Sequence, residues 1–366
     1  MGGRFRAGAW LAFAVGILIL GIELAGFFRD LNTTASSASS GDIAYHVQVF
    51  QNFLRGKPFQ MTILREGYGR GSHPPPYVNA AVIHTNFTPF LFVPLYRLFP
   101  GINGLYALVI GLNLLSVSLF GWFFLKRHAR EDALSRFLVF LAVVFGAHFF
   151  RIASYQCHML LFGTPFALIA HAALVRRNRR VFYPAIAALC LVSEDAAMFV
   201  MSYAGWIFAF EPDARREALG ALTLGAAILA LSVLVLMPAA RSGMACESSS
   251  YWAWALATRT PVAAAVLRAW VDLWPALVFL FVLVAVAAGA DFDARTTPLK
   301  MVGLVFLAPL SHWMIAFLTY GEHHLMPIFW AMIIALATML ALPPSARLRQ
   351  PAWKALLAGL AVLFVV

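Results

Sequence analysis

The sequence predicts an all-α polytopic membrane protein, a helical bundle of about 11 spans. The chain of 366 residues is 62% hydrophobic and 12% charged, whereas a soluble domain is nearer half apolar and a quarter charged. Apolar runs recur along the whole length, which excludes a soluble domain with a single anchor. The formal net charge of +11 requires no nucleic acid, because basic residues beside cytoplasmic helix ends produce such an excess. We therefore expect one transmembrane domain, 1–366, with no nucleic-acid partner.

The apolar runs set the expected elements. They lie near residues 8–28, 104–125, 137–152, 159–175, 181–193, 196–210, 218–238, 275–290, 301–319, 326–342 and 355–366. The first run follows Arg4 and Arg6 and is too long for a signal-peptide core, so it predicts a retained first helix. The last stretch, "ALLAGLAVLFVV", stops inside an apolar run, as a fragment or a truncated gene product with missing helices would.

Basic clusters decide how the shorter runs pair, because Lys and Arg next to spans mark the cytoplasmic side. The run 181–210 has "RRNRR" (176–180) before it and Arg215 and Arg216 after it. One straight helix would place one cluster outside, whereas two short helices that turn at "SEDAA" place both inside. The turn then carries Glu194 and Asp195 to an external hairpin tip, where water solvates them.

The same reasoning places three more external segments and a cytoplasmic N-terminus. Basic clusters flank the run 137–175, so its middle, "FFRIASYQCHML" (149–160), is an external tip. They also flank the run 301–342, so "TYGEHHLMP" (319–327) is another. Residues 29–102 form a long first external loop.

The first external loop contains two expected juxtamembrane helices. "SSGD" (39–42) resembles a helix start with Ser39 as cap and Asp42 three residues on. An apolar stripe follows, which predicts an amphipathic helix on the outer membrane surface with Asp42 and His46 on one face. The stripe consists of Ile43, Val47, Phe50 and Leu54. The stretch 87–99 predicts an interfacial helix.

Histidine and acidic side chains concentrate on the expected external side, which favours a functional site there over merely solvated loops. Cytoplasmic loops hold mainly Arg and Lys, while external ones hold His and acidic residues. Asp42, Glu194 and Asp195 are the candidate catalytic residues. The candidate substrate-binding residues are His46, His84, Asn86, Arg151, His158, Glu322, His323 and His324.

Several stretches together resemble a bacterial family of predicted membrane proteins of unknown function, related to GT-C glycosyltransferases. They are "GDIAYHVQVFQNFLRG", "HTNFTPFLFVPLYRLFP", "SYQCHMLLFGTPFALIAHAALVRR", the "SED" turn and, less closely, "YGEHHLMPIFWA". The resemblance implies a GT-C-like bundle in the bacterial inner (cytoplasmic) membrane. It also implies a transferase that uses a lipid-phosphate-linked sugar donor.

The resemblance also suggests roles. GT-C enzymes use a carboxylate of the first external loop as base or metal ligand, and Asp42 stands at that position. They often carry an acid at the tip between the third and fourth spans, where this sequence has His158. Because of that departure, we expect Glu194 and Asp195 to serve as the second acidic element. Sugar transfer from a polyprenyl phosphate needs a base on the acceptor and donors on the leaving phosphate, which the histidines and Arg151 would supply.

Other functions remain as alternatives. The acidic and histidine side chains include ligand types for a divalent metal, although no tight ligand spacing appears. No cofactor beyond such a metal is expected. A multi-span transporter would place charges within spans and show internal repeats, and neither is evident. An inactive GT-C-like scaffold would use the acidic pair only as a solvated turn.

Overall fold

The computed structural model describes residues 40–58, 60–61, 78–79, 85–128, 133–145, 159–241, 297–313 and 326–342, with Ala14 alone before them. Within these ranges the regular secondary structure is helical except for one antiparallel pair of two-residue strands, β1 (Gln60–Met61) and β2 (Val78–Asn79). The predicted helical class is therefore confirmed. The helices are α2 (Ser40–Leu54), α4 (Thr88–Tyr96), α5 (Ile102–His128), α6 (Ala133–Val144), η2 (Met159–Gly163), α8 (Thr164–Val175), α9 (Arg179–Cys190), α10 (Glu194–Phe210), η3 (Pro212–Ala214), α11 (Arg215–Ala230), η4 (Leu231–Leu236), α12 (Met237–Arg241), α15 (Thr297–Phe306) and α17 (Met326–Ala341).

Among the residues that the structure describes, two helical stretches are long and apolar enough to cross a membrane. One is Ile102–Arg127, and the other is Pro212–Ala240, which runs through α11, η4 and α12. The second stretch widens to a π-helix at η4, shortly before Pro238. Proline lacks an N–H and its ring crowds the carbonyl four residues earlier, so a wider turn relieves the clash without breaking the helix. Shorter apolar helices cover 133–144, 159–175 and 326–341.

Successive hairpins connect α8, α9, α10 and α11, which pack on one another. The predicted pair of short helices between residues 181 and 210 is confirmed, but the turn comes earlier than "SEDAA". It covers residues 191–193, and Glu194 already begins α10. Ser193 has extended backbone angles and its hydroxyl accepts a hydrogen bond from the Ala196 N–H at 3.1 Å. Ser193 is thus the N-cap, and the two carboxylates occupy the first turn, where the helix dipole favours negative charge.

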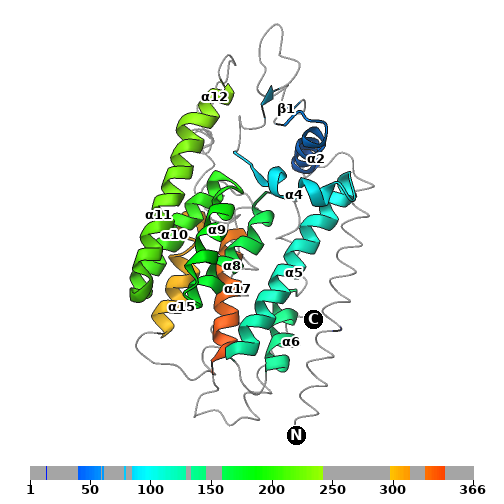
Figure 1. Ribbon diagram of the computed structural model, residues 1–366. Helices are drawn as coiled ribbons and strands as arrows, with labels where there is room; N and C mark the ends of the chain where they lie inside the picture. Colours follow the sequence, from blue (N-terminus) through cyan, green and yellow to red (C-terminus); the bar gives the residue numbers. More distant parts are fainter. Residues whose placement is uncertain are drawn as a thin grey trace, which may run out of the picture.

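Basic residues that precede or follow different helices meet at one end of the bundle, which we call the basic end. Arg177 pairs with Asp213 at 2.5 Å, and Arg179 pairs with Glu217, so the α8–α9 turn meets the start of α11. Lys300, in α15, pairs with Glu211 at 2.5 Å. This shared end agrees with the grouping expected from the positive-inside pattern. α2, α4 and α12 lie at the opposite end (Figure 1).

Arg136 ties α6 to the last turn of α17 at the basic end. One guanidinium nitrogen donates to the carbonyl oxygens of Leu340 and Leu342, at 2.6 and 2.5 Å. The last carbonyls of a helix have no partner within that helix, so this arginine caps α17.

Helix α2 forms where the sequence predicts it, and it buries part of the predicted stripe, with Phe50 in the core and Val47 packed against it. Phe50 is fully buried against Tyr96 and Phe162, with ring centroids 5.1 and 5.7 Å apart. Its other buried residues include His46 and Val49, whereas Leu54 of the predicted stripe is 38% exposed. The partners come from α4 and η2, far along the chain, so the buried face of α2 follows tertiary contacts.

Helix α17 occupies the centre of the bundle and is buried along nearly its whole length. Its Trp330 donates to the Thr164 hydroxyl at 3.0 Å, and Thr164 donates to the Asn113 side chain at 2.6 Å. This buried chain of hydrogen bonds fixes α17 to α8 and α5. Polar groups in an apolar interior need such partners, since water is not there to supply them.

Candidate functional site

The acidic pair at the α9–α10 turn is buried, which corrects the prediction of a solvated tip. Glu194 is 7% exposed and Asp195 is 4% exposed. Helix α9 has 12 residues, so the turn lies about 18 Å along the axis from the basic end. A hydrocarbon layer is about 30 Å thick. A helix of 12 residues is thus shorter than such a layer, and other parts of the chain cover the two carboxylates.

The cover over Glu194 is the segment that leads into α4. The backbone N–H of Thr85 donates to Oε2 of Glu194 at 3.1 Å, and the Thr85 hydroxyl lies 3.2 Å from the same oxygen. The Thr85 hydroxyl is also 2.8 Å from the hydroxyl of Ser232, in η4. Because the Thr85 hydroxyl has a single proton, it donates either to Glu194 or to Ser232, and in the first case Ser232 donates its own proton to Thr85. Three segments distant in sequence meet at this carboxylate.

A second contact fixes the same segment to the hairpin. The Phe87 N–H donates to the Leu191 carbonyl at 3.1 Å. Non-helical backbone inside a membrane protein is tolerated where it is buried in protein or lines a water-filled cavity. Thr85 and Asn86, which precede α4, are 3% and 5% exposed, which meets the first condition.

Asn86 adds an unsatisfied donor beside this contact. Its Oδ1 accepts from the Thr88 N–H at 2.9 Å and from the Thr88 hydroxyl. Because the Thr88 N–H can only donate, the atom facing it is the oxygen, and the amide nitrogen points the other way. Asn86 is 5% exposed, and its Nδ2 has no hydrogen-bond partner among the described residues. A buried donor of this kind calls for an explanation, and a ligand oxygen is one.

Helix α2 joins the site through α4. The Phe53 and Phe90 rings make an edge contact at 4.4 Å, and α4 begins directly after the Thr85–Phe87 segment. His46 lies on α2 and is 2% exposed. Asp42 falls in the first turn of α2, and its side chain lies outside the described part of the chain.

The structure thus brings Asn86 and Glu194 into one cluster, with Asp195 next to Glu194. It places His46 on the helix that packs against α4. The remaining predicted residues lie outside the described ranges, and their joining the site stays a prediction. They are His84, Arg151, His158, Glu322, His323 and His324.

No group of three or more His, Cys, Asp or Glu side chains that could hold a metal occurs within the described ranges. Most of the acids and histidines in the metal hypothesis lie outside these ranges, so that hypothesis stays untested.

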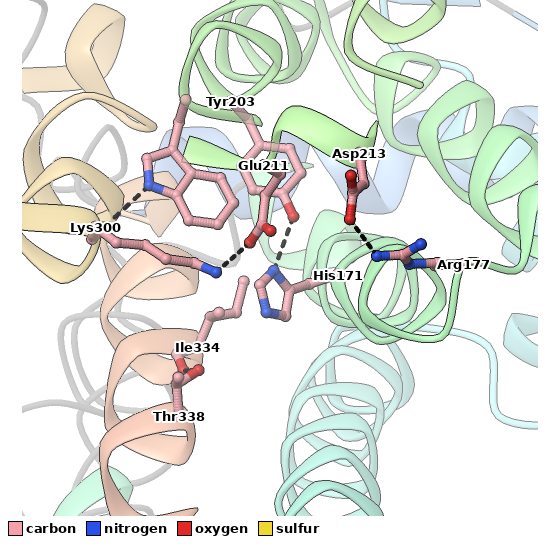
Figure 2. A network of polar contacts seen from close by, with 9 residues as sticks. His171, Arg177, Tyr203, Glu211, Asp213, Lys300, Ile334 and Thr338 are labelled. Carbon is pink, nitrogen blue, oxygen red and sulfur yellow. Dashed lines mark hydrogen bonds and ion pairs between the residues drawn. The ribbon is translucent and has the colours of Figure 1, made fainter. Parts of the chain in front are cut away.

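Sequence reasoning missed Thr85 and Ser232, and it also missed a polar network near the basic end. His171 and Tyr203 lie with Nδ1 and the hydroxyl oxygen 2.8 Å apart, and Lys300 reaches Glu211 (Figure 2). The Trp206 indole N–H donates to the Lys300 carbonyl at 3.1 Å. The network joins α8, α10 and α15, so His171 is a packed and hydrogen-bonded core residue. Nothing in the spacing of these residues signals the network, because its partners come from separate helices.

Comparison with known proteins places most of the chain in one family. Residues 38–366 match the family model described as Predicted membrane protein (DUF2079). No curated protein and no solved structure matches the chain.

Proposed function

The chain belongs to the DUF2079 family of predicted membrane proteins, and we propose that it is a GT-C-like membrane glycosyltransferase. It moves a sugar from a polyprenyl-phosphate donor to an acceptor on the extracytoplasmic face. In this proposal the protein lies in a bacterial inner membrane with a cytoplasmic N-terminus and about 11 spans. The basic end faces the cytoplasm, because Lys and Arg beside spans are retained there.

The observation that carries the proposal is a buried polar cluster with an unsatisfied donor. An ionisable residue inside a membrane is costly to keep, which makes it a candidate for function. Glu194 and Asp195 supply two carboxyl groups, and Nδ2 of Asn86 supplies a donor that no described residue uses. Carboxylates and amide donors are the groups that bind sugar hydroxyls and phosphate oxygens.

Within this proposal the carboxylates have different roles. Oε2 of Glu194 already accepts from Thr85, so Glu194 is a positioning residue that holds the loop segment against the hairpin. Asp42 is the general base that takes the proton from the acceptor hydroxyl, and Asp195 is the second acidic group at the substrate. Asn86 and His46 bind the substrate. His84, Arg151, His158, Glu322, His323 and His324 complete the phosphate and sugar contacts.

A lipid-linked donor suits the surroundings of the cluster. α4 follows the Thr85–Phe87 segment directly, and large apolar side chains are exposed in its first turn and just beyond its end. Phe90 is 55% exposed, Leu98 67% and Phe99 70%. An exposed apolar surface of this kind is typical of contact with lipid or with another apolar partner. It gives the polyprenyl tail a place beside the site while the sugar phosphate reaches the polar cluster.

A transporter is the second candidate function, and the buried turn between α9 and α10 favours it. Transporters place substrate groups at broken helices near the bilayer midplane. Chemistry separates the two functions, since a transporter returns its lipid-linked sugar unchanged.

The test is an assay of polyprenyl-phosphate release by the purified full chain with a panel of polyprenyl-phosphate sugars. Wild type releases the lipid phosphate, and the double variant Glu194→Gln/Asp195→Asn does not. Asp213→Asn serves as the control, because it also removes a carboxylate but lies exposed at the basic end. Folded wild-type protein that releases nothing from any donor would contradict the transferase and leave the transporter.

A further inference from the structure

An apolar groove between α5 and α8 ends at two arginines. The groove has a volume of about 420 Å³ and is lined by both helices together with the α8–α9 turn. Its apolar walls include Leu115, Phe123 and Ile169, which are 58%, 53% and 45% exposed. Arg127 and Arg176 line it where α5 and α8 reach the basic end (Figure 1). None of the residues that line the groove belongs to the proposed active site.

The length of the groove matches one leaflet of a bilayer. Its α5 wall runs from Leu112 to Arg127, a rise of about 22 Å at about 1.5 Å per residue. Half of a hydrocarbon layer is about 15 Å thick, and the headgroup region adds several ångströms. With Arg127 at the depth of the lipid headgroups, the apolar walls of the groove run parallel to the acyl chains of that leaflet.

The charges at the mouth of the groove select an anionic occupant. Arg177 and Arg179 of the α8–α9 turn are neutralised by Asp213 and Glu217. Arg127 and Arg176 have no carboxylate partner among the residues that the structure describes, and no acidic residue lines the groove. A guanidinium binds phosphate oxygens with paired, charge-assisted hydrogen bonds. The pairing of the neighbouring arginines makes these two the available cations at this mouth.

We propose that the groove binds one anionic phospholipid of the leaflet at the basic end. One acyl chain lies between α5 and α8, and the lipid phosphate binds Arg127 and Arg176. The bound lipid fills the gap between the two helices on the membrane side. This inference does not depend on the transferase proposal.

The test is native mass spectrometry of the full chain in detergent, titrated with phosphatidylglycerol or phosphatidylcholine of identical acyl chains. Wild type retains one phosphatidylglycerol in preference to phosphatidylcholine. Arg127→Gln/Arg176→Gln loses this preference, with phosphatidylglycerol affinity about tenfold weaker or more. The control Arg180→Gln/Arg216→Gln removes the same charge at the same end, outside the groove, and keeps the preference.

A steric variant keeps the test independent of charge. Ala172 lines the groove, and Ala172→Trp fills it and lowers the occupancy of both lipids. A thermal unfolding curve of each variant checks that it folds. Equal binding of the two lipids by wild type would overturn the proposal. So would an equal loss in the control variant, which would indicate a general charge effect, or a dimer whose interface covers the groove.

Discussion

Two atoms of Thr85, the backbone nitrogen and the hydroxyl oxygen, lie 3.1 and 3.2 Å from Oε2 of Glu194, across 109 positions of sequence. This contact supplies hydrogen-bond donors to the buried carboxylate of Glu194 at the start of α10. It also joins the segment before α4 to the hairpin of α9 and α10.

The first prediction concerns the stability that this contact gives. Glu194→Ala leaves the buried Thr85 N–H without its acceptor, which costs about 1–3 kcal/mol. Glu194→Gln keeps an acceptor oxygen and costs less. Thermal unfolding of the purified protein in detergent measures both. An alanine variant as stable as wild type would show that Glu194 does not hold the segment.

A double-mutant cycle separates the pair from its surroundings. Thr85→Ala and Glu194→Ala should be non-additive, with a coupling of about 0.5–3 kcal/mol, because the residues are in direct contact. The pair Thr223→Ala and Glu194→Ala is the control. Thr223 is exposed on α11 and bonds only within its own helix, to the Leu219 carbonyl. Additivity in the first pair would contradict the contact.

The second prediction concerns the close packing of Gly163 against α17. A Cβ at this position would lie 2.7 Å from the Trp330 ring and 3.0 Å from Leu189, both buried. Gly163→Ala should therefore cost about 1–3 kcal/mol through overpacking. Gly205→Ala is the matched control, because nothing lies within 4 Å of its Cβ position and alanine favours the helix. Unfolding curves that rank the two variants the other way would contradict this packing.

The third prediction concerns the hydrogen bond between His171 and Tyr203. Tyr203→Phe removes the hydroxyl and leaves the buried Nδ1 atom of His171 without its hydrogen-bond partner. The free energy of unfolding should fall by about 1–3 kcal/mol. Tyr183→Phe also removes a hydroxyl, but that group makes one long, exposed bond of 3.4 Å and its loss should be nearly neutral. Equal melting temperatures for the two variants would show that the network in Figure 2 adds no stability.

The helical hairpin of α9 and α10 could be predicted from sequence, because basic clusters flank the run on both sides and one straight helix would place one of them outside. The helix around Asp42 and the one after Asn86 were also predictable from local signals. The burial of Glu194 was not, because it depends on Thr85 and Ser232, which no periodicity links to it. The apolar stripe of α2 was predictable and its Phe50 is buried, but the partners of Phe50, Tyr96 and Phe162, were not. Local patterns specify helices, whereas tertiary partners decide which polar groups become enclosed.

The most direct test of the proposed transferase activity is the release of polyprenyl phosphate by the Asp42→Asn variant of the full chain. Asparagine keeps the size of the side chain and removes its ability to take a proton. We predict that the Asp42→Asn protein is folded and releases polyprenyl phosphate about 100-fold more slowly or worse, because it lacks a general base. Asp213→Asn should keep the wild-type release. An Asp42→Asn protein with wild-type release would contradict the assignment of Asp42 as the base.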